Sequence, residues 1–477
     1  MLPYPDWLNP GDNAWQLVAA TLVGLMSVPG IAVLYGGIVQ KKWAVNTMLM
    51  AFTGFSLVLV VWVLWGFKMS FGEPVTLFKG IPVLRSFVGI PHTILSSNNQ
   101  QIAMIPKLDG NMPSFRFPET TLAYFQFVFA GITPLLFLGS VIGRISFKVW
   151  LIFVPLWSTF AYSVNAFLLW GGGWWGEAGV LDYSGGYVIH LAAGTSGFVA
   201  AAVIGPRLKR DRDRAVPNNL PLAAVGAGVL WLGWNGFNGG DPYFAGADAS
   251  LAVLNTNLTT AVALLTWVIW DIFLSKQRKP TFLGAINGMI TGLVAITPAA
   301  GFVNSFGAII IGLVASTLVW FSWNYLGRTK LLKKVDDTLG VFHTHGVAGL
   351  AGGLLVGVLA DPKIVEYLGG SAGADVSASG WLYGHHPKQI LIQAGAAATV
   401  IVWDGLVTFV ILKVLGLFMK LRLPDEVLET GDVGVHDEEA YPDETLVTTS
   451  GRADWPKPPR AKTAAAESAE HAEPVDD

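Results

Sequence analysis

Eleven long apolar stretches dominate the sequence, and they constrain the fold more than any other feature. A helix that crosses the hydrocarbon core of a bilayer needs about 20 mostly apolar residues, and each stretch is close to that length or longer. The stretches lie at roughly 14–38, 44–67, 119–142, 149–171, 184–205, 219–240, 249–274, 282–302, 304–327, 340–360 and 389–419. They predict an all-α polytopic membrane protein with eleven transmembrane helices.

Composition argues against the alternative, a soluble protein of several domains. Only 13% of the residues are Asp, Glu, Lys or Arg, whereas ordinary globular proteins contain about 25%. So few charges are not enough to cover the surface of a soluble chain of 477 residues. The chain also has no cysteine, which excludes disulfide scaffolds, thiolate metal sites, iron–sulfur clusters and a cysteine nucleophile.

Lysine and arginine are distributed unevenly between the loops, and this predicts the orientation. With the N-terminus outside, the inside loops carry 18 Lys and Arg residues and the outside loops carry 7. An excess of basic residues is typical of cytoplasmic loops. We therefore expect an extracellular N-terminus (1–13), a transmembrane domain (14–424) and a cytoplasmic C-terminal tail (425–477), in the cell membrane. The first 13 residues lack the basic region of a cleavable signal sequence.

The net charge of −3 conceals two parts of opposite charge. Residues 1–424 hold 26 basic and 18 acidic residues, whereas residues 425–477 hold 4 and 15. The last 25 or so residues are rich in Pro, Ala, Glu and Lys, a composition typical of disorder. Because the basic residues are sorted among loops that flank apolar spans, the lipid bilayer is the expected partner and nucleic acid is not.

Two motifs recur five segments apart. The fifth segment contains His190-Leu-Ala-Ala193-Gly194-Thr-Ser-Gly197, and the tenth contains His345-Gly-Val-Ala348-Gly349-Leu-Ala-Gly352. Ile-Thr-Pro occurs likewise in the third and eighth segments. Five is odd, so paired segments cross in opposite directions. We expect an inverted repeat of about 14–205 and 219–360, with the helix at 389–419 appended and the substrate path at the repeat interface.

His190 and His345 each lie within an apolar span, where an ionisable group usually lines a path or cavity. The repeat would bring them together, and two imidazoles sharing one ring hydrogen would titrate as a pair. The alternative is two unrelated histidines bonded to neighbouring backbone. A metalloprotein using His190, His343 and His345 is a further alternative, but residues two apart on a helix point to different faces. No carboxylate third ligand is obvious, and no cofactor is expected.

From about Trp15 to Tyr441 the chain resembles the ammonium transporter family (Amt/Mep/Rh), in its prokaryotic Amt-like form. The matching strings are Gly30-Ile-Ala-Val-Leu-Tyr35-Gly-Gly37, Trp170-Gly-Gly-Gly173, Asp182-Tyr-Ser-Gly-Gly-Tyr-Val-Ile-His190, Gly233-Trp-Asn-Gly-Phe237-Asn238-Gly239, Ile296-Thr-Pro298 and Val341-Phe-His-Thr-His345-Gly346-Val347. The resemblance implies eleven spans, a homotrimer and one narrow pore per subunit. It implies transport of ammonium or ammonia, with methylammonium as an analogue, and not an enzyme.

The resemblance also implies roles for individual residues. Phe125, Phe129 and Trp170 match an aromatic outer vestibule that recruits ammonium, and Phe129 and Phe237 match a stacked pair that gates the pore. His190 and His345 match the twin pore histidines. Asp182 matches a buried carboxylate needed for structure and conduction, and it also suits a helix cap. Trp234 and Thr297 match pore-lining or adjacent positions.

These residues suit a pathway in which the cation loses its proton. Aromatic faces hold a cation, but the intact ion would pay a large desolvation penalty in a dry apolar pore. Ammonia needs only a hydrogen-bond partner midway, which the histidines supply, and the proton is either left outside or transferred separately. An ammonium sensor and an Rh-like gas channel are the alternative functions.

The chain departs from the family pattern at three places. Asp241 stands where many relatives carry serine, and a carboxylate facing the vestibule would strengthen cation recruitment. In the tail, Glu429-Thr-Gly-Asp432 replaces the family's E-G-L-D. The resemblance implies that this cytoplasmic segment docks on the inner face and regulates, and that a PII signal-transduction protein binds there in many prokaryotic members. The replacement weakens the PII expectation. The outside loop at 68–118 is longer than usual.

Overall fold

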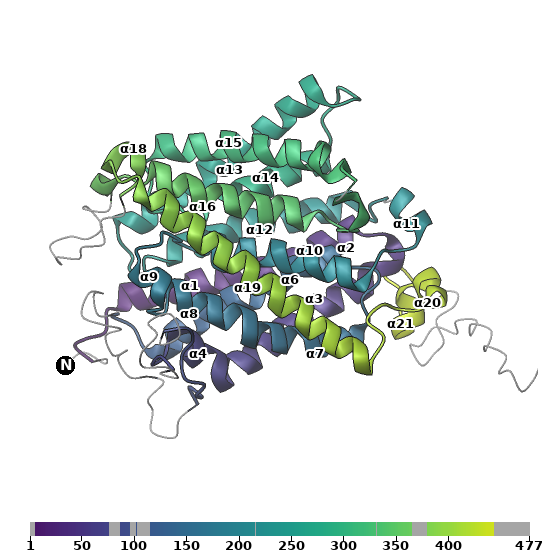
Figure 1. Ribbon diagram of the computed structural model, residues 1–477, viewed down its shortest axis with the longest axis horizontal. Coiled ribbons are helices and arrows are strands. Elements are labelled where there is room, and N and C mark those ends of the chain that lie inside the picture. Colours follow the sequence, from purple (N-terminus) through teal and green to yellow (C-terminus); the bar gives the residue numbers. More distant parts are fainter. Residues whose placement is uncertain are drawn as a thin grey trace, which may run out of the picture.

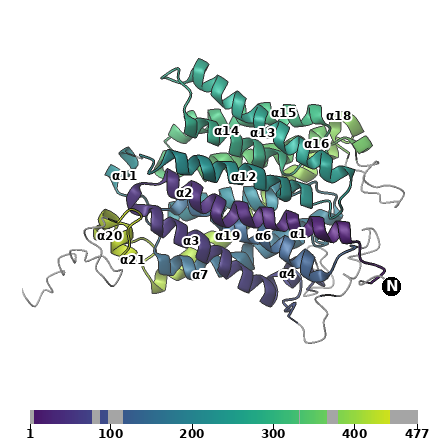
Figure 2. The ribbon, with the colours of Figure 1, turned by 180° about the vertical axis from the view of Figure 1, so that it is seen from behind.

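A computed structural model describes residues 5–75, 86–95, 102, 115–214, 216–330, 332–364 and 379–442. Most of the predicted long outside loops and residues 443–477 of the tail, including the segment expected to be disordered, lie outside these ranges. The described chain is helical, apart from two isolated bridges between Pro74 and Gly89 and between Ile145 and Arg422. Its long helices run side by side in one bundle (Figure 1), and the view from behind shows the same arrangement (Figure 2). The expected all-α class is confirmed.

Each predicted apolar segment coincides with a helix or with consecutive helices. The first five segments form α1 (Pro10–Leu25), η1 (Met26–Ile31), α2 (Ala32–Ile38), α3 (Ala44–Val61), η3 (Trp62–Gly66), α4 (Phe67–Phe71), α6 (Glu119–Val141), α7 (Phe147–Trp157), η5 (Ser158–Tyr162), α8 (Ser163–Leu169), η6 (Gly186–Leu191) and α10 (Ala192–Ile204). The other six form α12 (Leu220–Gly240), α13 (Ala247–Leu274), α14 (Phe282–Ile296), α15 (Ser305–Asn324), η9 (Phe342–Val347), α16 (Ala348–Leu359) and α19 (Lys388–Phe418).

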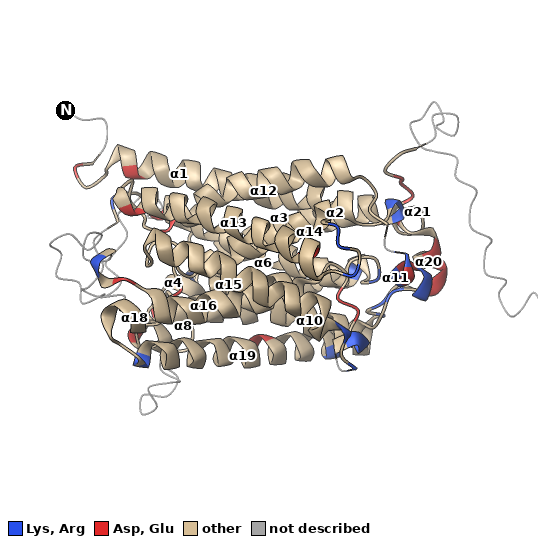
Figure 3. Ribbon diagram, turned by 90° about the horizontal axis from the view of Figure 1, so that it is seen from above, with Lys and Arg blue, Asp and Glu red and all other residues tan. Residues whose placement is uncertain are grey.

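Short helices lie near the two ends of the bundle. They are η2 (Lys41–Trp43), α9 (Trp174–Glu177), α11 (Lys209–Asp213), η7 (Leu326–Arg328), η8 (Leu332–Lys334), α18 (Trp381–Gly384), α20 (Asp425–Thr430) and α21 (Asp432–His436). We call the end that carries α9, α18 and the start of α1 the N-terminal face, and the end that carries α11, α20 and α21 the C-terminal face. Lys, Arg, Asp and Glu gather at these two faces, and the middle of the bundle is almost free of them (Figure 3). This distribution fits a bilayer around the middle.

Among the described residues, ten helical segments are long and apolar enough to cross a membrane. The eighth predicted span, expected at 282–302, is shorter: α14 has 15 residues and ends at Ile296. The carbonyls of Thr297 and Pro298 accept hydrogen bonds from Ser184 and Tyr183 (3.1 and 3.2 Å), which lead into η6. Pairing with a distant segment therefore replaces further helical turns. Eleven spans and the outside N-terminus remain predictions.

Helix α6 lies at the centre of the bundle. In its most apolar 18-residue window 94% of the residues are buried, against 33% for α19. The described chain also contains five π-helical turns, and η6 and η9 are two of them. Such turns are rare and are frequent at functional sites. His190 and His345 each lie in one.

Glycine contacts in the two halves of the chain correspond. A Cβ added to Gly194 would lie 2.3 Å from the Cα of Gly346, and one added to Gly349 would lie 3.1 Å from the backbone nitrogen of Leu191. Gly346 follows His345 directly, and Leu191 follows His190 directly. The helices therefore approach one another closely at these small residues. In each half, a motif glycine packs against the residue that follows the histidine of the other half. A pseudo-two-fold axis between the halves would produce this reciprocal contact, which supports the predicted inverted repeat.

Candidate functional site

Five rings form a continuous row through the centre of the bundle. Phe125 and Phe129, one turn apart on α6, have ring centroids 4.8 Å apart. Phe129 lies 4.3 Å from Phe237 of α12, and Phe237 lies 5.9 Å from His190 of η6. His190 lies 5.6 Å from His345 of η9. The first four rings have no exposed surface and His345 is 5% exposed, so four different elements together build a closed, dry row.

Trp234 forms one wall of this row. Its ring stacks on His190 at 5.3 Å with an interplanar angle of 22°, and on Phe237 at 4.9 Å with 30°. Its Nε1 donates to Oγ1 of Thr297 at 3.0 Å, and the Thr297 hydroxyl donates to the carbonyl of Leu293 at 2.8 Å. Both side chains are fully buried, so the hydrogen bonds fix the indole against the imidazole.

The two histidines do not share a ring hydrogen. Neither Nδ1 nor Nε2 of His190 has a hydrogen-bond partner among the described residues, although the side chain is completely buried. Nδ1 of His345 instead lies 2.9 Å from Oγ1 of its neighbour Thr344, and the two rings are tilted by 51°. The hydrogen-bonded pair expected from the sequence is therefore wrong. Buried nitrogens without partners are uncommon in proteins, which makes His190 the chemically open position in the row.

Asp182 caps the turn that holds His190. Its carboxylate accepts hydrogen bonds at 3.1 Å from the backbone nitrogens of Tyr187 and Val188, in the first turn of η6. The expected cap is thus present. Trp170, which ends α8, donates from Nε1 to the carbonyl of Asp182 at 2.8 Å. Within the described chain Trp170 makes no ring contact with Phe125 or Phe129, so it adjoins the Asp182 segment and not the row of rings.

Asp241 lies beside the Phe125 end of the row. It follows α12, is 8% exposed, and its Oδ2 has no hydrogen-bond partner among the described residues. A Cβ added to the preceding residue, Gly240, would lie 2.4 Å from the ring of Phe125. Asp241 is also close enough to Ser184 and Asp182 for electrostatic interaction. The sequence-derived placement of Asp241 near the aromatic vestibule therefore fits this position.

Sequence reasoning missed Asp337, which performs for His345 the task of Asp182. Its carboxylate accepts from the backbone nitrogens of Val341 (3.1 Å) and Phe342 (2.8 Å), where η9 begins. Asp182 precedes His190 by eight residues, and Asp337 precedes His345 by eight residues. Extending the repeated motif eight residues toward the N-terminus would have revealed the pair.

Two further polar residues, His343 and Asp404, have hydrogen-bond partners. Nδ1 of His343 lies 2.8 Å from Oγ of Ser322, beside the row and not in it. Asp404, in the middle of α19, accepts from Nδ2 of Asn165 at 2.6 Å, and both are fully buried. No group of three or more His, Cys, Asp or Glu that could hold a metal occurs in the described part of the chain.

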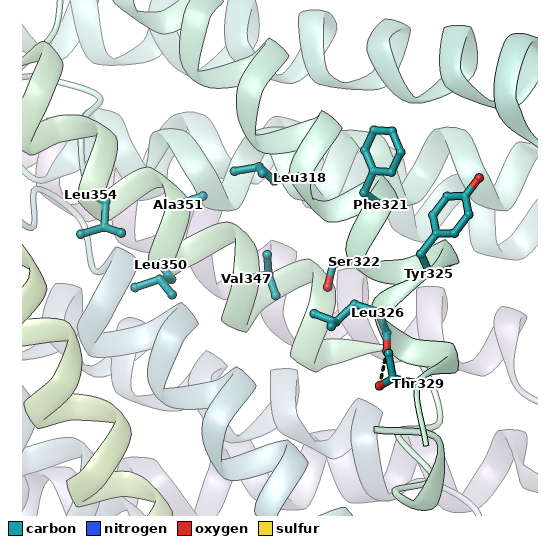
Figure 4. A pocket seen from close by; sticks show the side chains of 10 residues that line it. All are labelled: Leu318, Phe321, Ser322, Tyr325, Leu326, Thr329, Val347, Leu350, Ala351 and Leu354. Atoms are coloured by element: carbon teal, nitrogen blue, oxygen red, sulfur yellow. Dashed lines mark hydrogen bonds between the residues drawn. The ribbon is translucent and has the colours of Figure 1, made fainter. Parts of the chain in front are cut away.

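A shallow apolar groove runs along the outside of α15 and α16. Its volume is about 630 Å³, and its lining includes Leu318 and Phe321 of α15 and Leu350 and Leu354 of α16 (Figure 4). The lining is almost entirely apolar, as expected of a surface in contact with lipid chains. It is separate from the row of rings and carries no polar chemistry of its own.

The first part of the C-terminal tail is docked on the C-terminal face. Oδ1 and Oδ2 of Asp432 accept at 2.8 Å from the backbone nitrogens of Asn46 and Val45, at the start of α3. Lys42 donates to the carbonyl of Leu428 at 2.7 Å, and Leu428 is fully buried. Nε2 of His436 lies 2.9 Å from Oδ1 of Asn46. The tail therefore keeps an aspartate contact despite its altered motif.

Comparison with known proteins agrees with this geometry. The family model described as Ammonium Transporter Family matches residues 14–441. The curated ammonium transporter 2 member 1 of Oryza sativa subsp. japonica is 50% identical over 441 residues, covering 92% of this chain and 88% of its own. The crystal structure of Saccharomyces cerevisiae Mep2 has a TM-score of 0.74 at 29% identity, covering 88% and 91%. A structure described as a sensor Amt protein has a TM-score of 0.74 at 25% identity, covering 88% and 96%.

Proposed function

The chain belongs to the ammonium transporter family, and from this premise we propose that it binds ammonium at its N-terminal face, removes a proton and conducts ammonia past His190 and His345. The observation that carries the proposal is the buried row of rings that ends on two imidazoles, one with both nitrogens unpartnered. The proton is either released outside or transferred separately. No catalytic residue and no cofactor are assigned.

Recruitment falls to Phe125, Phe129, Trp170 and Asp241. An aromatic face attracts a cation by about 0.5–2 kcal/mol, depending on how far the site is desolvated. The Asp241 carboxylate, with one oxygen free of hydrogen bonds to described residues, adds a charge that a serine would not. The cation is thereby held close to Asp182 and to the outer end of the row.

The stacked Phe129 and Phe237 act as the gate. A bare cation in so apolar a passage would lose its hydration, at a cost on the order of tens of kcal/mol on an idealised Born basis. Neutral ammonia pays a far smaller desolvation cost. Potassium has no proton to give up, so the same gate rejects it. Beyond the gate, the two free nitrogens of His190 and Nε2 of His345 offer ammonia a hydrogen-bond partner, and Trp234 and Thr297 hold the wall.

Orientation, assembly and regulation follow from the same family premise. We place the N-terminal face outside and the C-terminal face in the cytoplasm of a cell, in agreement with the excess of basic residues in the loops expected inside. The transporter is a homotrimer with one pore per subunit. The docked tail regulates it from the cytoplasmic side, and a PII protein is a candidate partner for that face.

A sensor function is the second candidate, favoured by the likeness to the structure described as a sensor Amt protein. Methylammonium uptake into proteoliposomes containing the purified protein separates the two. If the protein is a transporter, methylammonium uptake should exceed that of protein-free liposomes. Ammonium should compete with this uptake, and potassium should not. Binding of methylammonium without uptake contradicts transport and supports the sensor.

A further inference from the structure

A second cavity, of about 710 Å³, opens on the C-terminal face. It lies between α13, α14 and α15 and the loops that follow α2 and α6, and three tryptophans, Trp43, Trp267 and Trp323, line it. One carboxylate belongs to the lining, that of Asp271 on α13. Aromatic rings beside one carboxylate are the same combination that Phe125, Phe129 and Asp241 provide near the N-terminal face.

The Asp271 side chain is held on one side and open on the other. Its Oδ1 accepts from Nε1 of Trp320 at 2.9 Å, and its Oδ2 makes no hydrogen bond to another described residue, although Asp271 is only 8% exposed. Trp267, one turn earlier on the helix, is 2% exposed, and its Nε1 likewise has no partner in the described chain. A carboxylate oxygen and an indole N–H of the lining therefore both lack a hydrogen-bond partner among the described residues, and because neither belongs to the fully buried unpartnered atoms, both are open to the cavity.

A glycine keeps the space between these two atoms open. If Gly284 carried a Cβ, it would lie 2.6 Å from Oδ2 of Asp271 and 3.0 Å from Nε1 of Trp267. Gly284 stands in the first turn of α14, where its own nitrogen donates to Oγ1 of Thr281 and not to Asp271. The carboxylate therefore does not serve as the cap of α14.

The other charges of the lining do not neutralise this carboxylate by direct contact. Arg207 pairs with Asp336 at 2.7 Å, and Lys279 lies exposed in the loop before α14. A small cation that donates N–H hydrogen bonds fits Oδ2 of Asp271, and the lone pair of its neutral form fits Nε1 of Trp267. The neighbouring indole faces add attraction for the charged form.

We propose that Asp271 and Trp267 form a second ammonium site at the cytoplasmic mouth, where ammonia that has crossed the pore is held as ammonium once it regains a proton from cavity water. The site rests on the proposed function, since it has a role only if ammonia reaches this face. It binds the same ion as the outer vestibule, from the other side of the membrane.

Asymmetric transport kinetics test the site. Methylammonium flux is measured in right-side-out and inside-out vesicles that contain the full chain, and KM is determined for each face. Asp271→Asn keeps an acceptor for Trp320 but removes the charge. We expect it to raise the cytoplasmic-side KM about five- to tenfold, because a nearby full charge is lost from a poorly hydrated cavity, and to leave the outer-side KM unchanged.

Two further variants control for structure and charge. Asp425→Asn removes an exposed carboxylate from the same face, where it pairs with Arg422 at 2.7 Å outside the cavity, and it should alter neither KM. The double variant Asp271→Asn/Asn287→Asp moves the charge to another residue of the lining and should recover most of the lost affinity. A merely structural role for Asp271 predicts no recovery.

The outcomes separate the second site from the proposed function. Wild-type vesicles without methylammonium flux in either orientation would overturn both. Normal wild-type flux with an unchanged cytoplasmic-side KM in Asp271→Asn, or equal shifts of KM on both faces, would overturn the second site alone. If Asp271→Asn is poorly folded by thermal unfolding, Asn287→Asp alone decides: the site predicts a lower cytoplasmic-side KM, and an unchanged value contradicts it.

Discussion

Asp182 and Asp337 hold the turns of His190 and His345 in the same way from opposite halves of the chain. Each carboxylate accepts hydrogen bonds from two successive backbone nitrogens at the start of a π-helical turn, and each precedes its histidine by eight residues. A π turn leaves backbone groups without their usual helical partners, so an anionic cap at its start stabilises it. The positions of His190 and His345 therefore depend on two aspartates whose hydrogen bonds go to the backbone and not to the rings.

Replacing either cap with asparagine should destabilise the protein. Asp182→Asn and Asp337→Asn each turn one acceptor into a donor that faces a backbone N–H, at an expected cost of about 1–3 kcal/mol. Thermal unfolding in detergent measures the change, with Asp425→Asn as the exposed control. Equal unfolding temperatures for the caps and the control would show that neither carboxylate bears on stability.

Thr297 should matter through its hydroxyl alone. Thr297→Val keeps the shape but leaves the buried Nε1 of Trp234 without its acceptor at 3.0 Å, which costs about 1–3 kcal/mol. Thr297→Ser keeps the hydroxyl and should unfold at nearly the wild-type temperature. A valine variant as stable as the serine variant would contradict the role assigned to this hydrogen bond.

The close crossing of η6, α10, η9 and α16 should tolerate no added methyl group. Gly194→Ala would place a Cβ 2.3 Å from the Cα of Gly346, a backbone atom that cannot move aside, and overpacking of this kind costs about 1–3 kcal/mol or more. Gly228→Ala on α12 is the matched control, because nothing lies within 4 Å of its Cβ position and alanine favours a helix by about 1 kcal/mol. The unfolding temperature should fall for Gly194→Ala and rise for Gly228→Ala.

Asp432 should hold the tail in place. Asp432→Asn leaves one of the backbone nitrogens of Val45 and Asn46 facing an amide donor, so the tail should detach and become accessible to protease. Asp437→Asn, one turn further along the tail, changes an exposed carboxylate and serves as the control. The rate of cleavage within the tail at low protease concentration measures docking, and equal rates for the two variants would contradict the contact.

Docking should also depend on pH. Burial, aided by Glu438 and Glu439, raises the pKa of Asp432 from 3.8 to about 6 against the lowering effect of the backbone nitrogens. The docked tail therefore binds an extra proton between these values, and docking weakens as pH rises through about 6. Burial lowers the pKa of His436 from 6.5, so protonation of His436 opposes docking in acid.

His436→Gln isolates the aspartate. Glutamine can still meet the Asn46 amide but does not titrate, so the tail of this variant should be cleaved more slowly at pH 5 than at pH 7, with protease activity corrected by an unstructured peptide. Faster cleavage at pH 5 would contradict the assignment to Asp432.

Sequence patterns predicted the helices well where one physical cause acts alone. Bilayer thickness sets the length of an apolar span, so each of the eleven predicted segments coincides with helical structure. The end of α14 was not predictable, because the Thr297 and Pro298 carbonyls pair with Tyr183 and Ser184, more than a hundred residues earlier. The partner of Asp404 was hidden for the same reason, since Asn165 is 239 residues away.

The candidate site shows the same division. The motifs predicted His190, His345, Phe129 and Phe237, and the structure brings these four rings into one row. The hydrogen bond expected between the imidazoles is absent, because ring tilt and helix crossing are properties of the packed bundle and not of the motif. Asp337 was within reach of the sequence, but only through comparison of the two halves.

The most direct test of the central claim, conduction of ammonia past the two histidines, is ammonium and potassium flux in proteoliposomes with the membrane current recorded. For the wild type we predict ammonium flux without potassium flux, and the current shows whether the proton crosses. The double variant His190→Ala/His345→Ala should lose ammonium flux or its discrimination against potassium, while Gly228→Ala keeps both. Undiminished, fully selective ammonium flux in the folded double variant would contradict the account.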